Sequence, residues 1–445
     1  MHHPQGDDTP ARLLRSPRFG PFFVTLFLGT FNDNLFKNTL ILMVVYQAAT
    51  QQGGNVNQLT NLAAALFILP YLLFSAIAGQ LADRWEKSRL IRSLKLVEVA
   101  LMLLTAQALL SHNLTLLMVL LFLMATQSAV FSPIKFSLIP QHLERWQWVS
   151  GNGLVEAGTF AAILLGTLIA GLIYPHAWGM ALVSALIVIQ ALAGWLAARH
   201  IPPAPSIAPE LQPDWNPLRA SIRLIGNYWS SPRLRLLILF NAWFWFVGAS
   251  YLTQIPNFAR SVLGGNATCV SWLLACLTIG IGLGSLGCSR LKRDRYGREM
   301  PCLGLALMVL AGLDLVWASP ALQLAAGDGM IELLRQLSGW RISVDLVLIG
   351  VAGGLFIVPL CTQFQAWTDG RDRARVFAVS NIFNALFMVV SALAGFVLLG
   401  NANWSIPQFF LLIALLNLAA LALLVRFRPH WAAASLLRLW PAGKR

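Results

Sequence analysis

The sequence predicts an all-α integral membrane protein, and three observations lead to this class. Of the 445 residues, 57% are hydrophobic and only 11% are charged, and the mean hydropathy is +0.66; this composition excludes an ordinary soluble globule. The apolar residues gather in about twelve runs, each long enough to cross a hydrocarbon layer of about 30 Å as a helix. Alternating porin-type patterning is absent, and a backbone in lipid must satisfy its own hydrogen bonds, so the spans should be helices.

The spans fall into two groups of six, separated by a long connection. This connection, "HIPPAPSIAPELQPDWNPLRASIRLIGNYWSSPRLR", is rich in proline at first and amphipathic from about Asn216, which is typical of an interdomain linker. We predict a tail at 1–18, a six-helix bundle at 19–200, a linker with an amphipathic helix at 201–232, a second six-helix bundle at 233–428 and a tail at 429–445. The spans are expected at 19–47, 59–82, 90–110, 114–138, 150–173, 177–198, 234–258, 268–290, 301–319, 344–366, 376–398 and 405–427.

Arginine and lysine are distributed unevenly among the loops. They cluster before the first span and after the second, sixth, eighth and tenth spans, whereas alternate loops such as "AATQQGGNVNQ" and "GNANWS" have none. Only Arg260, Arg335 and Arg341 fall on the poorer side. Positive charge accumulates on the cytoplasmic side of a membrane. The net charge of +14 therefore indicates topology rather than nucleic-acid binding, and both termini are expected to be cytoplasmic.

Four charged side chains lie inside expected spans, where an ionised group costs about 2.5–3.5 kcal/mol and usually serves a function. Asp33 and Lys37 are one helical turn apart in the first span, and Lys135 and Glu156 lie near the cytoplasmic ends of the fourth and fifth spans. We interpret all four as groups that bind a charged headgroup in a central cavity. Two alternatives stay open: Asp33 and Lys37 neutralise each other, or Lys135 and Glu156 form an ion pair that braces two helices.

Uncharged polar residues in other spans are candidates to complete the same binding site. They are Asn152, Asn241, Tyr251, Gln254, Asn381 and Asn384. The aromatic run from Trp243 to Phe246 is a candidate wall for an acyl chain, and ordinary lipid-facing aromatic residues would look the same. No residue pattern indicates a catalytic group, a metal site or a cofactor, so none is expected.

One loop resembles the signature loop of the major facilitator superfamily, G-x-L-a-D-R-x-x-[KR]-x-[KR]. The segment is "GQLADRWEKSRL" at 79–90, and the matching residues are Gly79, Asp83, Arg84, Lys87 and Arg89. The resemblance implies a twelve-helix major facilitator fold with two six-helix bundles. It also implies that these residues form a conformational gate, in which the glycine allows close helix contact and Asp83 and Arg84 lock the bundles together on the cytoplasmic face.

A second resemblance extends over nearly the whole chain. The segments "GTFNDNLFKN", "ILPYLLFSAIAGQLADR", "SAVFSPIKFSLIPQHL", "GNGLVEAGTFAAILLGTLIAG" and "NIFNALFMVVSALAG" resemble the lysophospholipid transporter family, especially the transporter domain of bacterial transporter/acyltransferase fusions. The resemblance implies a flippase, not an enzyme, in the bacterial inner membrane. It would move lysophospholipids such as lysophosphatidylethanolamine to the cytoplasmic leaflet by alternating access.

The expected partners follow from this interpretation. They are the lysophospholipid substrate, membrane lipids and an acyltransferase or acyl-ligase, with no nucleic acid, and the protein is expected to be a monomer. Two other functions remain open. One is a proton-coupled exporter of amphiphilic drugs, with Asp33 or Glu156 titrating; the other is a non-transporting partner that presents lipid to an acyltransferase.

Overall fold

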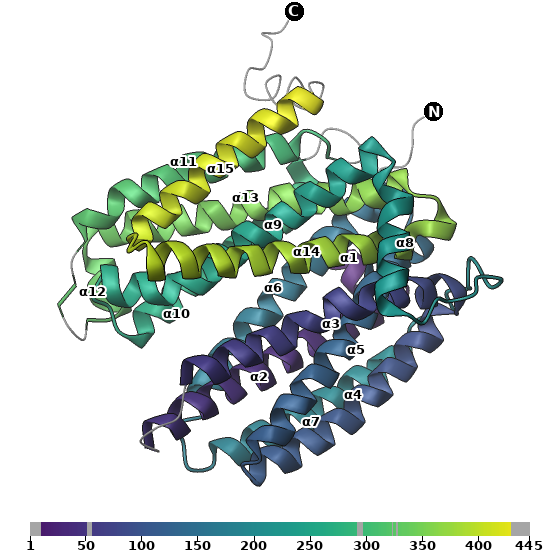
Figure 1. Ribbon diagram of the computed structural model, residues 1–445, viewed down its shortest axis with the longest axis horizontal. Helices are drawn as coiled ribbons and strands as arrows, with labels where there is room; N and C mark the ends of the chain where they lie inside the picture. The colour runs from purple at the N-terminus through teal and green to yellow at the C-terminus, as the bar shows by residue number, and fades with distance from the viewer. Residues whose placement is uncertain (1–9, 51–55, 292–296, 323, 326–327, 429–445) are drawn as a thin grey trace, which may run out of the picture. The chain divides into compact units, whose positions relative to one another are not determined.

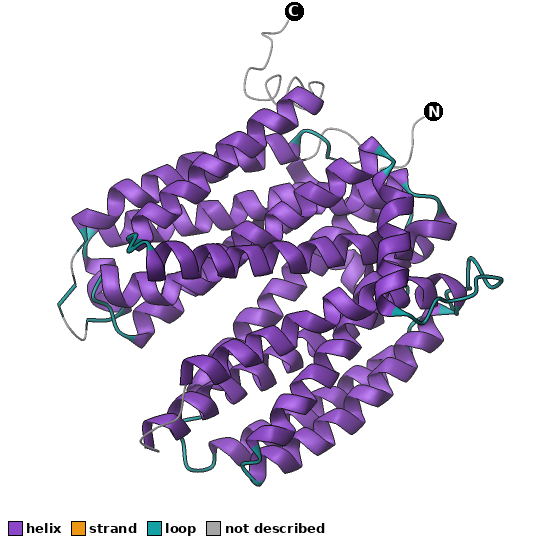
Figure 2. Cartoon of the chain, viewed as in Figure 1, coloured by secondary structure: helices purple, strands orange, loops and turns teal. Residues whose placement is uncertain are grey.

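The computed structural model describes residues 10–50, 56–291, 297–322, 324–325 and 328–428. In these ranges every regular element is helical and none is a strand (Figure 1, Figure 2). The predicted tail at 429–445 and the first nine residues of the tail at 1–18 lie outside them. The α-helices are α1 (Pro10–Arg15), α2 (Gly20–Thr50), α3 (Val56–Arg84), α4 (Lys87–Leu110), α5 (Leu114–His142), α6 (Trp148–Ile173), α7 (Gly179–Ala198), α8 (Pro217–Trp229), α9 (Pro232–Asn257), α10 (Ala267–Leu291), α11 (Met300–Ala318), α12 (Met330–Arg335), α13 (Leu337–Trp367), α14 (Arg373–Gly395) and α15 (Ile406–Phe427).

Eleven helices in the described ranges are long and apolar enough to cross a membrane. The one expected span that is not among the eleven is the first, at 19–47; it corresponds to α2, which has 31 residues and is therefore long enough. Its middle contains the run from Asn32 to Asn34, followed by Lys37 and Asn38, and these polar residues lower its hydropathy. The helix that carries the charges of interest is thus the least lipid-like of the expected spans.

Contacts between Cα atoms divide the chain into two compact units. Unit 1 comprises Met1–Glu144, Ala161–Ile238 and Phe364–Ala385, and unit 2 comprises Arg145–Phe160, Leu239–Gln363 and Leu386–Arg445. Unit 1 therefore includes the first half of α14 together with the N-terminal helices. The bundle boundaries expected from the sequence, 19–200 and 233–428, stay a prediction.

Unit 1 is built around an apolar core to which α2, α4, α5 and α7 contribute. Leu35, Met102, Leu121 and Ile187, one from each of these helices, are fully buried in it. The helices α3 and α5 pack together, as do α4 and α7, and α8 packs on α3. Polar and charged side chains are also buried in this unit, among them Asn32, Asp83, Lys95 and Glu98.

In unit 2, α10 and α13 approach each other closely through glycines. A Cβ atom added to Gly280 or Gly284 would lie 2.2 or 2.1 Å from a carbonyl oxygen of α13, and the facing Gly350 and Gly354 are equally restricted. Glycines four residues apart on two facing helices are a common device for close packing in membranes. These glycines therefore let the backbones of α10 and α13 pack in direct contact. In the same unit, α11 and α15 also pack against each other.

Candidate functional site

A polar face of α5 collects several of the candidate residues in unit 1. Ser128, Ser132 and Lys135 follow one another at steps of four and three residues, so they lie on one side of the helix, and all three are partly exposed. Ser128 Oγ donates to Asp33 Oδ2 at 2.6 Å, and Asn381 Nδ2 donates to Ser132 Oγ at 2.9 Å. We call these five residues the α5 polar face. The sequence had pointed to Asp33, Lys135 and Asn381 but not to the two serines.

Asp33 and Lys37, although one turn apart, do not form an ion pair with each other in the described part of the chain. Lys37 Nζ donates to Asn34 Oδ1 at 3.1 Å and lies 4.8 Å from the centre of the Phe67 ring. Asp33 Oδ1 is buried and has no hydrogen-bond partner among the described residues. The direct ion pair that the sequence left open is therefore absent, and one carboxylate oxygen of Asp33 remains an unused acceptor.

A buried ion pair that the sequence did not predict is connected to Asp33 through two polar side chains of α5. Lys95 Nζ lies 2.6 Å from Glu98 Oε2, and both side chains are only 2% exposed. Gln127 Nε2 donates to the same Glu98 oxygen at 3.2 Å, and Ser128 Oγ lies 3.3 Å from Gln127 Oε1. A continuous polar chain thus runs from α4 through α5 to Asp33.

The space for this ion pair comes from a glycine on α2. A Cβ atom at Gly29 would lie 2.2 Å from Lys95 Nζ, so a larger residue there would force the ammonium group to shift. A signal was present in the sequence: Lys95 and Glu98 stand three residues apart inside the apolar run "LKLVEVALMLL", and residues at this spacing are neighbours on a helix. The pair lay within an expected span, just as Asp33 and Lys37 do.

Lys95→Met is expected to destabilise the folded protein strongly, because it leaves the Glu98 carboxylate buried without a counter-charge. Removing one partner of a buried ion pair typically costs about 3–5 kcal/mol. Thermal unfolding of the purified protein in detergent would measure the loss. The double variant Lys95→Met/Glu98→Met should recover part of the stability, since it removes both charges. A double variant no more stable than the single one would contradict this reading.

At the C-terminal end of α3, Asp83 connects three segments of unit 1. Its carboxylate is fully buried and lies 3.1 Å from Arg375 Nε, and it also accepts from the backbone N–H groups of Ala374 and Arg375 at 3.3 and 3.4 Å. The Asp83 carbonyl oxygen accepts from the N–H groups of Ile207 and Ala208 in the linker. The end of α3, the start of α14 and the linker therefore meet at one carboxylate.

Gly79, one turn before Asp83, allows this contact. A Cβ atom at Gly79 would lie 2.6 Å from Ala378 Cβ and 2.9 Å from Arg375 Cα. Any larger residue would push α3 away from α14 and lengthen the contacts of Asp83. The close helix contact expected of this glycine thus has a definite partner, the first turns of α14.

Glu86, which was not among the predicted gate residues, joins the linker to α4. It caps α4 by accepting from the N–H groups of Ser88 and Arg89 at 3.0 and 2.7 Å, and it accepts from Ala204 N–H at 2.7 Å. Partial burial raises the pKa of Glu86, but these three N–H groups outweigh it and hold the pKa below its usual value. The carboxylate therefore stays ionised and keeps the linker on the loop between α3 and α4.

The other three predicted gate residues have fewer contacts. Arg84 is partly exposed and makes no hydrogen bond or ion pair within the described ranges. Lys87 is buried; its N–H donates to Ala204 O at 3.0 Å, while its ammonium has no hydrogen-bond partner in the described part of the chain. Arg89 is 85% exposed and lies 3.9 Å from Glu86. Of the predicted gate, Gly79 and Asp83 are the residues placed against α14.

The remaining candidates are distributed over both units. Asn152 in unit 2 is fully buried and donates to Thr362 Oγ1 at 3.1 Å, which links α6 to α13. Tyr251 is buried with its ring 4.9 Å from that of Phe410.

Lys135 belongs to unit 1 and Glu156 to unit 2, so their pairing stays a prediction. Buried Glu156 and Asn241 and partly exposed Gln254 lie in unit 2, and buried Asn384 lies in unit 1.

Comparisons with known proteins agree with this architecture. The sequence profile of the Major Facilitator Superfamily matches residues 22–331. The lysophospholipid transporter LplT of Serratia proteamaculans is 24% identical over 352 residues, which cover 76% of this chain and 77% of that protein. LplT of Escherichia fergusonii is 26% identical over 352 residues, 77% of this chain and 78% of that protein.

Solved structures share the fold at low sequence identity. The human organic anion transporter MFSD10 superposes with a TM-score of 0.68 at 14% identity, covering 90% of this chain and 99% of that chain. A bacterial homologue of the iron transporter ferroportin gives a TM-score of 0.63 at 14% identity, with 92% and 99% covered. These findings confirm the predicted all-α membrane fold and the resemblance to lysophospholipid transporters.

Proposed function

Because the chain belongs to the Major Facilitator Superfamily, we propose that this multi-pass membrane protein transports lysophospholipids. It would take them from the outer to the cytoplasmic leaflet of the bacterial inner membrane by alternating access. Two curated relatives that match about three quarters of the chain are named lysophospholipid transporters, which supports the substrate class. The direction rests on the resemblance to transporters that are fused to acylating enzymes.

The observation that carries the proposal is the α5 polar face. It places an acid, Asp33 of α2, and a base, Lys135 of α5, on the same face of α5, and one oxygen of Asp33 has no partner among the described residues. A lysophospholipid headgroup carries a phosphate and, in lysophosphatidylethanolamine, an ammonium group. A carboxylate accepts hydrogen bonds from the ammonium, and a lysine ammonium is a mobile cation for the phosphate.

The aromatic run from Trp243 to Phe246, which the sequence offered as a candidate wall for an acyl chain, lies in unit 2 and packs on α6. Phe160 on α6 packs edge-on against Phe244 at 6.0 Å between ring centres and stacks on Trp245 at 6.4 Å. Rings of this kind offer a large apolar surface at low entropic cost. Glu156 lies one turn before Phe160 on the same helix, so this unit also places a charge beside an apolar surface.

In spheroplasts that lack their own lysophospholipid transporter, the protein is expected to carry labelled lysophosphatidylethanolamine to the cytoplasmic leaflet. There a cytoplasmic acylating enzyme would convert it to the diacyl lipid, and the appearance of that product measures the transport. Spheroplasts with an empty vector are the control. Expressed protein in the membrane with no product above the control would contradict the proposal.

Two further observations distinguish the other two functions. A proton-coupled drug exporter would confer resistance to amphiphilic drugs that collapses with the proton gradient, without any lipid movement. A lipid-presenting partner would need the acyltransferase for any effect on lysolipid distribution. We expect a monomer without metal or cofactor that delivers substrate to such an acyltransferase or acyl-ligase.

A further inference from the structure

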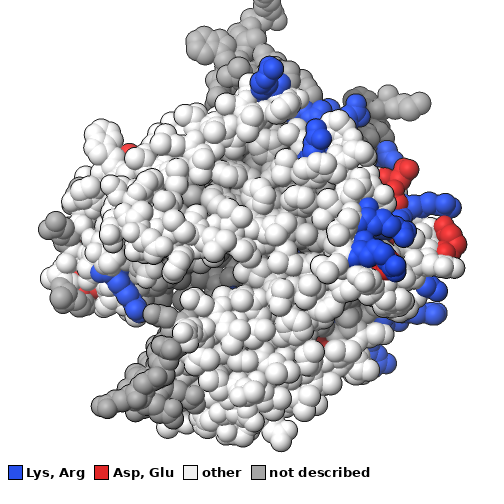
Figure 3. All heavy atoms as spheres, in the orientation of Figure 1, with Lys and Arg blue, Asp and Glu red and all other residues white. Residues whose placement is uncertain are grey.

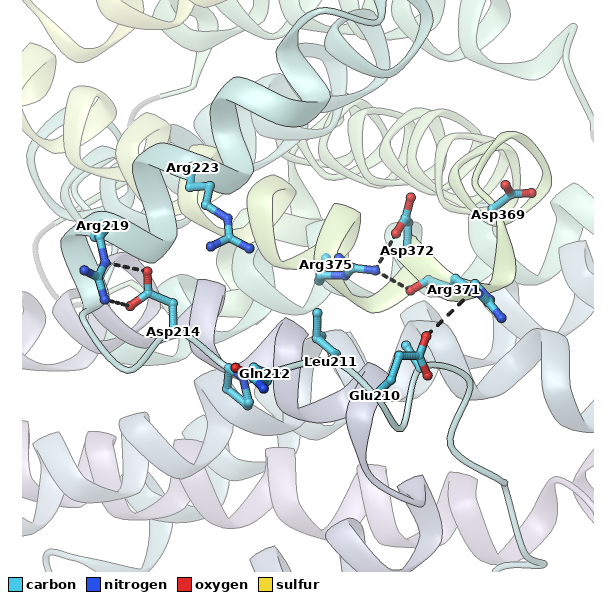
Figure 4. Close-up of a pocket in the computed structure, with 12 residues that line it drawn as sticks. Glu210, Leu211, Gln212, Asp214, Arg219, Arg223, Asp369, Arg371, Asp372 and Arg375 are labelled. Atoms are coloured by element: carbon cyan, nitrogen blue, oxygen red, sulfur yellow. Dashed lines mark hydrogen bonds and ion pairs between the residues drawn. The ribbon is translucent and has the colours of Figure 1, made fainter.

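A cavity of about 870 Å³ in unit 1 is formed where the linker, α8 and the start of α14 meet (Figure 4). It belongs to the side that the distribution of charge predicts to be cytoplasmic, and Figure 3 shows lysine and arginine gathered at the edge that carries α8. Its lining contains four arginines and four acids: Arg219, Arg223, Arg371, Arg375, Glu210, Asp214, Asp369 and Asp372. The pairing among these groups decides what the cavity can bind.

Three of the four arginines are already engaged by carboxylates. Arg219 holds Asp214 with two hydrogen bonds of 2.7 and 2.8 Å, and this pairing keeps the pKa of Asp214 below its usual value. Arg371 lies 3.8 Å from Glu210, and Arg375 is shared between Asp83 and Asp372. Each of these three arginines therefore has a nearby carboxylate that offsets its charge.

Arg223 is the exception. It makes no hydrogen bond or ion pair with any residue that the structure describes, and its guanidinium points into the cavity, toward the space between Arg219 and Arg375 (Figure 4). The remaining acid without an ion pair in the described ranges, Asp369, points away from it (Figure 4). The cavity therefore offers a planar cation with free N–H donors, the group that proteins use most readily for phosphate.

The same helix presents apolar side chains to the outside. Leu218 and Ile222 are 68% and 73% exposed, while Ala220, Leu224 and Tyr228 are buried. Leu218 and Ile222 are one turn apart, and each is followed directly by an arginine, so an apolar strip and a basic strip run side by side along α8. Basic amphipathic helices of this kind lie in the membrane interface and attract anionic headgroups.

We propose that this cavity binds the phosphate of an anionic phospholipid from the cytoplasmic leaflet. Arg223 holds the phosphate, and the acyl chains lie against Leu218 and Ile222. The apolar strip favours a lipid over a soluble phosphate, which would gain nothing from it. Because Arg375 lines the cavity and also binds Asp83, a bound headgroup adds negative charge beside the contact that holds α3 on α14. The site is thus separate from the α5 polar face and does not depend on the transported substrate.

Native mass spectrometry of the purified full-length protein, titrated with phosphatidylglycerol, tests the proposal. Arg223→Gln should weaken binding about fivefold, the effect of one arginine near an anionic surface, and Arg223→Lys should retain most of it. Leu218→Ser/Ile222→Ser should weaken binding of the lipid but not of inorganic phosphate. Arg426→Gln, which removes an exposed arginine outside the cavity, is the matched control and should bind as the wild type does.

Two results would overturn the proposal. The first is equal phosphatidylglycerol affinity for the wild type, Arg223→Gln and Arg426→Gln, which would mean that Arg223 holds no headgroup. The second is displacement of the lipid by inorganic phosphate at similar concentration, which would identify a site for a soluble anion. Because binding is measured without transport, neither result bears on the transported substrate.

Discussion

Replacing Asp33 by asparagine is expected to reduce transport of lysophosphatidylethanolamine by about tenfold to a hundredfold, the equivalent of one charge-assisted hydrogen bond of about 1.5–3 kcal/mol. Asparagine keeps the shape of the side chain and can still accept from Ser128, so the fold should persist. It loses the negative charge that the free carboxylate oxygen offers to the ammonium group. Initial rates of uptake into proteoliposomes, normalised to inserted protein, would measure the effect.

The effect of Asp33→Asn should depend on the headgroup of the transported lipid. Lysophosphatidylglycerol has no ammonium group, so Asp33→Asn should affect its transport much less than that of lysophosphatidylethanolamine. Asp314→Asn is the matched control: Asp314 also lies in a membrane helix, but its side chain and that of its partner Arg341 are 37% and 45% exposed, so the change should be tolerated. Equal losses for both lipids would show that Asp33 acts on the fold and not on the headgroup.

Asp83→Asn is expected to slow transport of all lysolipids by about tenfold or more, because it weakens a charge-assisted contact worth about 1.5–3 kcal/mol. The loss should be independent of the headgroup, which distinguishes a conformational role from a binding role. Rates in proteoliposomes with two different lysolipids are the measurement. Arg89→Gln, which changes an exposed side chain in the first turn of α4, should leave the rates unchanged.

The partner of Asp83 can be identified by a double-mutant cycle. If Asp83 and Arg375 act through each other, the variant Asp83→Asn/Arg375→Gln should transport no more slowly than the slower single variant. Effects that multiply, as for independent sites, would contradict the coupling. Arg375 keeps Asp372 as a second partner, so the single Asp83 variant should still fold.

The helical fold was predictable because hydropathy is a local property of the chain. Runs such as 301–319 and 405–427 match α11 and α15 within one residue at each end, since apolar residues in lipid have to form helices. The prediction for 344–366 was less accurate, because α13 begins at Leu337, where Trp340 and Arg341 lower the hydropathy without ending the helix.

The partners of the candidate residues were much less predictable. Asp83 and Arg375 are 292 positions apart, and no local pattern connects them; the arginine counted only as one of the basic residues of a loop. Ser128 and Ser132 were missed for another reason, since the spacing that puts them on one face with Lys135 was visible but serines are unremarkable in a membrane helix. Charge identified the candidate residues, and only the packing identified what each charge contacts.

The most direct measurement is translocation of fluorescent lysophosphatidylethanolamine across liposomes that contain the purified protein and no other component. We expect rapid loss of the lipid from the donor leaflet, with Asp33→Asn much slower and Asp314→Asn normal. Protein-containing liposomes that move the lipid no faster than empty ones, under an imposed proton or sodium gradient or without one, would contradict the central claim that the chain is itself a lysophospholipid transporter.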